Sequence, residues 1–330
     1  MIEFQVKQRD TGPNTFNMAL ASLRIVFMGT PEFAVASLDA LVKAGYNIVG
    51  VITAPDKPAG RGMKMNESAV KKYAVDHNLK VLQPEKLKNP EFLEELKALH
   101  ADLQIVVAFR MLPEVVWNMP RLGSVNLHGS LLPQYRGAAP INWAVINGEK
   151  ETGVTTFKLK HEIDTGDILL QESFPIGENE TAGEVHDRMK EIGAQVLVKT
   201  VKGLAEGTLK EKPQSAIGNR QTAILRHAPK IFTETCRIDF KKTVDEVHNL
   251  IRGLSPFPGA FTNLHEKMLK VYRGEKETTT PSSKAGEFET DSKTFLKFAC
   301  ANGYIQVKEL QLEGKKKMNT EEFLRGYRFP

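Results

Sequence analysis

The chain has 330 residues, 41% hydrophobic and 26% charged, with a formal net charge of +5 at pH 7. This length suffices for two domains, and the composition is typical of globular proteins. No run of 18 apolar residues is present, and Cys236 and Cys300 stand alone, which argues against a membrane span, a disulfide scaffold and a metal site.

The first 23 residues lack a basic start followed by an apolar stretch, so a secretory signal is not expected. They predict an N-terminal extension, residues 1–23, in which Met18 is an alternative start. The segment has no Arg-rich amphipathic pattern typical of organellar transit peptides.

Strands and helices are predicted to alternate from residue 24 onward. Short apolar runs predict strands at 24–29, 47–53 and 101–109. Apolar residues at helical spacing predict helices at 33–45, 67–78 and 90–99. This alternation indicates an α/β fold with a doubly wound, mostly parallel sheet, in which ligands bind beyond the carboxyl ends of the strands. A long helical pattern at 181–207 closes this first domain, residues 24–205.

A second domain is predicted after an extended linker, residues 206–229. One helix at 243–252 is followed by short strand-like segments at 260–265, 267–274, 294–300 and 304–312, as expected for a small OB-type β-barrel over residues 230–330. Residues 275–292 are expected to form a mobile loop. From residue 206 to the end there are 22 Lys and Arg against 16 Asp and Glu, which fits a polyanionic partner or an ordinary basic surface.

Nucleotide-binding motifs are weak in this sequence. The stretch FMGTPEF has one glycine where a dinucleotide site needs G-x-G-x-x-G, and no P-loop is present. The use of NAD or ATP is therefore poorly supported.

Polar residues gather in the stretch VNLHGS and in the turn HEIDTGDIL. Asn126 and His128 share one face of a strand at its end, and Asp164 precedes a Thr-Gly turn that can direct its carboxylate into a crevice. An amide donor, an imidazole and a carboxylate suit attack on a carbonyl. Because no G-x-S-x-G nucleophile is present, direct transfer between two bound substrates is the simpler mechanism. The alternative is that these residues only stabilise a strand end and a turn.

The Asn-x-His, Ser-Leu-Leu-Pro and Asp-Thr-Gly elements resemble the signature of the folate-dependent formyltransferases. Within that superfamily the chain is similar to the methionyl-tRNA formyltransferases, from RIVFMGTPEFAV through APDKPAGRG to LQLEGKKKMNTEEFLRG, so nearly everything after residue 23 is covered. The resemblance implies an enzyme that transfers the formyl group of 10-formyltetrahydrofolate to the amino group of methionyl-initiator tRNA.

The same resemblance implies the site residues. Asn126, His128 and Asp164 correspond to the family's catalytic residues: His128, held by Asp164, helps to remove the amine proton, and Asn126 with His128 stabilises the oxyanion. Whether His128 or Asp164 is the formal base stays open. The folate contacts fall on Ser130, Leu131, Leu132 and Pro133. The candidate wall of the pterin pocket is Val107, Ala108, Phe109, Arg110, Met111 and Leu112, where Phe109-Arg110 departs from the Tyr-Gly of many relatives.

Two basic segments are candidates for tRNA contact. The loop 54–68 is rich in Pro and Gly without apolar periodicity, and the resemblance implies that it enters the acceptor stem, with Arg61 at the key basic position. A solvated connector is the alternative for this loop, as a solvated turn is for the run 314–319. The candidate residues are Lys57, Arg61, Lys64, Lys315, Lys316 and Lys317.

Other activities on the same scaffold remain open. The acceptor can instead be glycinamide ribonucleotide, an amino sugar or water, although the basic C-terminal portion and the Arg61 loop count against the first. A non-catalytic tRNA-binding protein is a further alternative. The expected location is the bacterial cytoplasm, with organelles as the alternative, and no membrane association or obligate protein partner is indicated.

Overall fold

A computed structural model describes residues 23–59, 64–216 and 224–329 of the chain. By their contacts, the described residues fall into two compact units. The first lies within Met1–His128, Thr155–Gln171 and Lys190–Ile217, and the second within Gly129–Val154, Glu172–Met189 and Gly218–Pro330. Each unit is thus assembled from three segments of the chain. The N-terminal extension expected at residues 1–23 falls outside the described residues except for Leu23.

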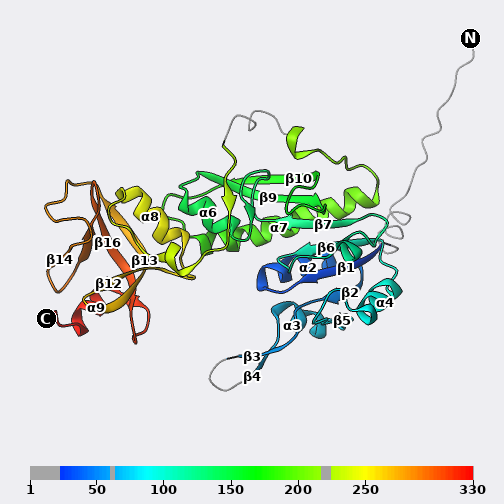
Figure 1. Ribbon diagram of the computed structural model, residues 1–330, viewed down its shortest axis with the longest axis horizontal. Helices are drawn as coiled ribbons and strands as arrows, with labels where there is room; N and C mark the ends of the chain where they lie inside the picture. Colours follow the sequence, from blue (N-terminus) through cyan, green and yellow to red (C-terminus); the bar gives the residue numbers. More distant parts are fainter. Residues whose placement is uncertain (1–22, 60–63, 217–223, 330) are drawn as a thin grey trace, which may run out of the picture. The chain divides into compact units, whose positions relative to one another are not determined.

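Most of a seven-stranded sheet with the order β10-β9-β7-β6-β1-β2-β5 belongs to the first unit, and the second unit includes parts of β9 and β10 (Figure 1). The strands of this sheet are β1 (Arg24–Gly29), β2 (Asn47–Ile52), β5 (Val81–Leu82), β6 (Leu103–Val107), β7 (Ser124–His128), β9 (Glu151–Lys158) and β10 (Ile168–Pro175). From β5 to β7 neighbouring strands are parallel, whereas β9 runs antiparallel to β7. The mostly parallel sheet predicted from the sequence is confirmed.

The chain direction across this sheet reverses at β1. From β1 the chain adds β2 and β5 on one side, and it then returns to add β6 and β7 on the other. In such sheets the crevice at the carboxyl ends of the strands beside the reversal is where ligands bind. Gly29 ends β1 there, and a Cβ at this position would lie 2.7 Å from the Ala34 Cβ and 3.1 Å from the Val107 carbonyl oxygen. Glycine therefore permits the close approach of the strand end to the helix α2 (Glu32–Lys43).

Helices follow the strands, and the four predicted from the sequence are confirmed. They are α2 (Glu32–Lys43), α3 (Ala69–Asp76), α4 (Pro90–Ala98) and α7 (Ala182–Ala205). The short α5 (Glu114–Trp117) was not predicted. The Ser68 side chain caps α3 by accepting from Lys71 N, and Asn89 caps α4 in the same way with Pro90 at its first position. Within the described residues, no helix is long and apolar enough to cross a membrane.

The segment 54–68, which was expected to be a loop, contains two short strands. β3 (Lys57–Ala59) and β4 (Lys64–Asn66) pair antiparallel with Lys57 opposite Asn66, and the hairpin extends beyond α3 in Figure 1. The two strands pair through their backbones and have no apolar pattern, so periodicity could not predict this hairpin.

The second unit contains a curled, antiparallel half-barrel sheet with the order β12-β13-β16-β15-β14, and β17 pairs with β16. The strands are β12 (Ala260–Leu264), β13 (Lys267–Glu277), β14 (Phe288–Thr290), β15 (Leu296–Ala299), β16 (Tyr304–Leu312) and β17 (Met318–Asn319). The helix α8 (Val244–Gly253) packs on this sheet. The helix α9 (Thr320–Gly326) directly follows β17 and contacts β16 and β17. A capping box formed by Thr243 and Glu246 begins α8.

Two sequence-based expectations in the second half of the chain need correction. The stretch 275–292, expected to be a mobile loop, includes the end of β13 and all of β14, because Phe288 packs on the apolar core and lies 6.1 Å from the ring of Phe298. The linker 206–229 is also not simply extended. It contains the 3₁₀ turn η1 (Gln214–Ala216) and the strand β11 (His227–Ala228), which pairs with β8 (Arg136–Gly137). The segments that form these pairings are short and lack apolar periodicity, so the sequence pattern could not predict them.

Candidate active site

The end of β7 presents Asn126 and His128 on one face of the sheet. Asn126 lies opposite Val106 of β6 and Phe157 of β9, and His128 lies opposite Thr155. Alternation of side chains along the strand explains why two residues in the pattern Asn-x-His share a face. His128 is 7% exposed and its ring lies edge-on to Phe157, with 6.5 Å between the ring centroids. The imidazole is thus held in a largely dry position at the carboxyl end of the strand.

Asp164 lies in the turn between β9 and β10, and this turn brings its carboxylate to His128. The Oδ2 atom of Asp164 is 3.9 Å from Nδ1 of His128, and the two side chains are 14% and 8% exposed. This distance exceeds that of a hydrogen bond but lies within the range of an ion pair. The structure therefore brings together two of the predicted residues that lie 36 positions apart in the sequence.

The backbone of this turn explains its Asp-Thr-Gly sequence. Asp164 adopts a left-handed conformation with φ of 55°, which aspartate tolerates better than most residues. A Cβ on Gly166 would lie 1.6 Å from the Lys158 carbonyl oxygen, so glycine is required at that position. The Thr165 hydroxyl donates to the Glu162 carbonyl at 3.0 Å and closes the turn locally.

The segment 107–112 follows the end of β6 in the same unit. Val107 is buried, Ala108 adopts a φ of 46° and Met111 is 73% exposed. The Arg110 guanidinium donates to the carbonyl oxygens of Glu85 and Pro84, and burial lowers the pKa of this side chain. Arg110 thus fixes the loop that contains Pro84 and Glu85. Phe109 and Leu112 both pack against the apolar core of the sheet.

The Ser-Leu-Leu-Pro segment directly follows β7 in the chain and belongs to the second unit. Ser130 and Leu132 are buried, whereas Leu131 and Pro133 are half-buried. The Ser130 hydroxyl donates to the Gln134 carbonyl at 2.6 Å, and the Leu132–Pro133 peptide bond is cis. The segment is a tight turn that leaves parts of two apolar side chains accessible.

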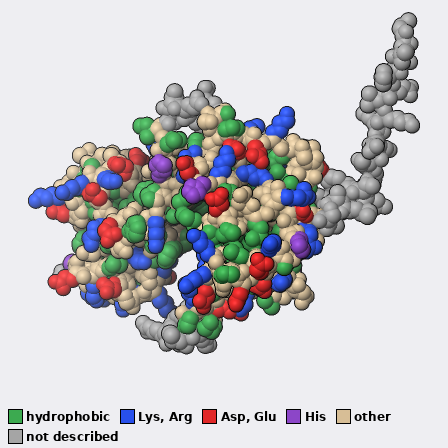
Figure 2. All heavy atoms as spheres, turned by 45° about the vertical axis from the view of Figure 1, so that its right-hand side comes forward, with side chains coloured by type: hydrophobic (Ala, Val, Ile, Leu, Met, Phe, Trp, Pro, Cys, Tyr) green, Lys and Arg blue, Asp and Glu red, His purple; other side chains and the backbone are tan. Residues whose placement is uncertain are grey.

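The candidate tRNA residues occupy exposed segments in so far as they can be described. Lys57 lies on β3, Lys64 begins β4, and Arg61 falls outside the described residues. Lys315, Lys316 and Lys317 are exposed at the turn after β16. Lys317 forms an ion pair with Glu309 at 2.6 Å, so its charge is partly neutralised. On the face seen in Figure 2, Lys and Arg side chains alternate with Asp and Glu rather than forming one continuous basic patch.

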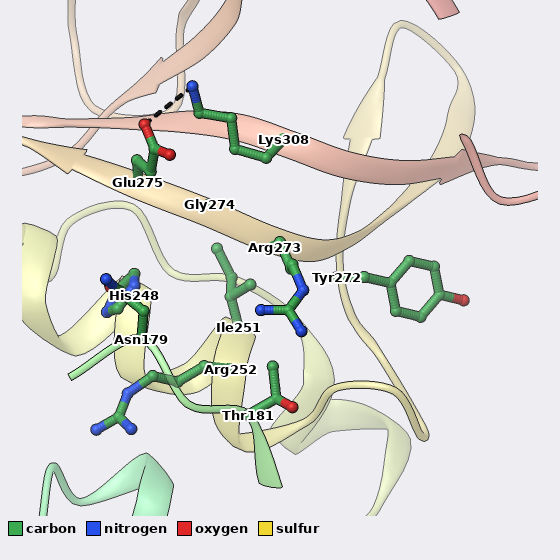
Figure 3. A pocket seen from close by; sticks show the side chains of 10 residues that line it. All are labelled: Asn179, Thr181, His248, Ile251, Arg252, Tyr272, Arg273, Gly274, Glu275 and Lys308. Atoms are coloured by element: carbon green, nitrogen blue, oxygen red, sulfur yellow. Dashed lines mark ion pairs between the residues drawn. The ribbon is translucent and has the colours of Figure 1, made fainter. Parts of the chain in front are cut away.

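A separate cavity of about 180 Å³ lies in the second unit, between α8, β13 and residues 179–181 (Figure 3). Among the residues that the structure describes, none of the predicted site residues lines it. Arg252 in its wall donates to the carbonyl oxygens of Gly177 and Glu180, and Arg273 and Lys308 pair with Glu184 and Glu275. Because its cations already have such acceptors, the cavity does not favour a charged ligand.

One polar residue near the predicted site had no signal in the sequence. Gln214 of η1 donates from Nε2 to the carbonyl oxygens of Asp164 and Gly166, at 2.8 and 2.9 Å. It lies 50 residues after Asp164, in the segment expected to be a featureless linker. Neither apolar periodicity nor a sequence motif could identify Gln214, because it lies in a polar stretch that matches no known pattern.

Comparisons with known proteins agree with this fold. A formyl transferase family model matches residues 23–201, and a model of the formyl transferase C-terminal domain matches residues 230–328. The chain is 54% identical to a methionyl-tRNA formyltransferase of Bacteroides fragilis, over 94% of this chain and 97% of that protein. It is 56% identical to a methionyl-tRNA formyltransferase of Phocaeicola vulgatus, over 94% and 98%.

A solved structure of similar fold is that of an N-formyltransferase from Helicobacter canadensis in complex with folinic acid and dTDP-3-aminofucose. It aligns with a TM-score of 0.64 at 21% identity, over 90% of this chain and 100% of that one. The sheet and both family matches define the class of formyl-group transferases. The chain belongs to the methionyl-tRNA formyltransferase family, which confirms the resemblance found in the sequence.

Proposed function

We propose that this enzyme transfers the formyl group of 10-formyltetrahydrofolate to the amino group of methionyl-initiator tRNA, which yields formylmethionyl-tRNA for translation initiation. Family membership supports formyl transfer and the methionyl-tRNA acceptor. The observation that supports this chemistry is the approach of the Asp164 carboxylate to His128, with 3.9 Å between Nδ1 of His128 and Oδ2 of Asp164. Asn126 lies on the same face of the same strand as His128.

The reaction requires an unprotonated amine, because only its lone pair can attack the formyl carbon. A C–N bond forms to the methionyl nitrogen while the amine loses a proton, and the bond to N10 of the folate then breaks and N10 takes up a proton. His128, held by Asp164, receives the amine proton, and a shift of the carboxylate of about 1 Å would bring the pair to hydrogen-bond distance. Either member of the pair can serve as the formal base.

The tetrahedral intermediate carries a negative charge on the former formyl oxygen. Asn126 has an amide that can donate to this oxygen, and its place on the same strand face as His128 lets both groups meet one substrate carbon. Because His128 is buried, little water competes for hydrogen bonds to the oxyanion beside it, and these bonds are stronger than they would be in water. No covalent enzyme intermediate is needed in this scheme.

Substrate contacts are assigned as follows. The folate lies against Ser130, Leu131, Leu132 and Pro133 and against the 107–112 segment. The tRNA contacts the hairpin bearing Lys57, Arg61 and Lys64, together with Lys315, Lys316 and Lys317. We further assign the catalytic domain to residues 24–205, the linker to 206–229 and the tRNA-binding domain to 230–330, divisions that the two family matches support. A translation enzyme with bacterial relatives is expected in the cytoplasm.

Transfer of labelled formyl from 10-formyltetrahydrofolate tests the proposal, with methionyl-initiator tRNA, glycinamide ribonucleotide and no acceptor in parallel. Label on the tRNA alone supports it. Label on glycinamide ribonucleotide, or release of formate without acceptor, overturns the acceptor while keeping formyl chemistry. Binding of tRNA without consumption of the donor would point to a non-catalytic protein.

A further inference from the structure

The carboxamide of Gln214 bridges two backbone carbonyls of the turn that carries Asp164. Its Nε2 lies 2.8 Å from the Asp164 oxygen and 2.9 Å from the Gly166 oxygen, so the two N–H groups of one amide have separate acceptors. Gln214 is 7% exposed, and a buried amide of this kind forms hydrogen bonds that are costly to lose. The contact lies entirely within the first unit.

The segment that carries Gln214 is itself hydrogen-bonded to the sheet. Lys212, two residues before Gln214, exchanges backbone hydrogen bonds of 2.8 Å in both directions with Ile168, the first residue of β10. Gln214 therefore cannot drift away from the turn without breaking this bridge as well. The 3₁₀ turn that begins at Gln214 fixes the direction of its backbone.

The geometry of Asp164 makes this support relevant to chemistry. Its left-handed backbone, with φ of 55°, is less favourable than an extended or helical one and has to be held by contacts. The carbonyl that Gln214 binds belongs to the same residue as the carboxylate that faces His128. Rotation of the peptide at 164 would therefore also redirect the carboxylate.

We propose that Gln214 is a positioning residue, which holds the Asp164 carboxylate toward His128 through the backbone of the turn. This inference rests on the proposed function, in which Asp164 supports His128 during formyl transfer. The linker then does more than connect two domains, because it supplies part of the support for the catalytic turn.

A double-mutant cycle tests this role. Gln214→Ala and Gln214→Glu are expected to lower kcat by about 10- to 100-fold with little change in the KM for the folate, since misplacement of a catalytic group has effects of this size. In the Asp164→Asn background the same replacements should change kcat by less than about twofold, because residues that act as a unit are non-additive. Gln214→Asn retains an amide with a shorter reach and should be intermediate.

Gln104→Ala is the matched control, because Gln104 is a buried amide (1% exposed) at the amino-terminal half of β6 and binds Ser124 at 3.0 Å. It should lower stability without this kinetic pattern. If Gln214→Ala lowers kcat equally in both backgrounds, Gln214 is only structural and the inference is wrong.

Hydrogen exchange of the backbone amides 160–168 provides a readout that needs no substrate. Faster exchange in Gln214→Ala than in Gln104→Ala supports the inference, and equal exchange overturns it. Inactivity of the wild-type enzyme toward methionyl-tRNA would instead overturn the proposed function, while the exchange result would still decide the role of Gln214 in the turn.

Discussion

His128 and Asp164 face one another across 3.9 Å, although they come from a central strand and from the turn of a neighbouring hairpin. β7 and β9 set this relationship by pairing antiparallel with His128 opposite Thr155. The β9–β10 turn then returns Asp164 to the strand end. The distance between imidazole and carboxylate is thus a product of sheet register and turn conformation together.

Removal of either partner should stop most of the reaction. His128→Ala or Asp164→Ala is expected to lower kcat by about 100-fold or more, as loss of acid–base assistance does. Steady-state formylation of methionyl-tRNA measures the effect. His77→Ala, at an exposed position at the end of α3, serves as the control. Near-normal rates in the purified His128 and Asp164 variants would contradict the assignment.

Asn126→Ala should act differently, because the amide is assigned to the oxyanion rather than to the proton. We expect a loss of about 3 kcal/mol of transition-state stabilisation, corresponding to about 100-fold in kcat. Binding of the folate measured by fluorescence should change little. A variant that loses folate affinity but keeps kcat would place Asn126 in ground-state binding instead.

The sequence indicated much of this arrangement because its signals were local. Short apolar runs and helical spacing predicted β1, β2, β6 and the helices between them, and the alternation of Asn126 and His128 put both on one face. The long-range contact with Asp164 came from the resemblance, since periodicity contains no information on which turn meets which strand.

Features built from isolated residues could not be predicted. Gln214 and β14 lie in polar stretches, and their structure depends on partners outside those stretches. The partner of Gln214 is the turn at 164, 50 residues away, and the partner of Phe288 in β14 is Phe298 in the next strand. The β3–β4 hairpin likewise has backbone pairing without an apolar pattern. Local propensity is weakest where backbone pairing to distant or polar partners decides the conformation.

Arg61→Ala should weaken tRNA use while folate binding survives. Arg61 lies outside the described residues, and the expectation comes from the resemblance together with the cations Lys57 and Lys64 on the flanking strands. An arginine can make bidentate contacts to phosphate or base edges that a lysine cannot. The KM for methionyl-tRNA, measured at several salt concentrations, should rise in the variant and show a smaller salt dependence. An equal loss of folate binding would argue for a general defect.

Gly166→Ala should disturb both stability and catalysis. The added Cβ would meet the Lys158 carbonyl oxygen at 1.6 Å, so the turn carrying Asp164 has to move. We expect destabilisation of more than about 2 kcal/mol, as for other strongly overpacked sites, together with reduced kcat. Gly326→Ala is the control, since a Cβ there meets nothing within 4 Å. Urea denaturation compares the two, and equal midpoints would show that the turn adapts without cost.

His248 should make the folded protein less stable in mild acid. Burial, followed by the positive charges of Arg252 and Lys276, lowers the pKa of this imidazole to about 4, whereas Glu178 and Asp245 act in the opposite direction (Figure 3 shows His248 and Arg252). Between pH 6.5 and 4 the unfolded chain therefore binds the proton and the folded chain does not. The free energy of unfolding falls as pH decreases through this interval, by up to about 3 kcal/mol from this residue.

Replacement of His248 by glutamine removes the titrating group and keeps a polar side chain of similar size. The urea midpoint of His248→Gln should accordingly fall less than that of the wild type between pH 6.5 and 4. His161→Gln is the control, because the side chain of His161 is 88% exposed and its replacement should leave the wild-type pH dependence in place. If the urea midpoints of the wild type and His248→Gln fall in parallel with pH, another group causes the acid sensitivity. The pKa of His248 would then not be lowered by folding.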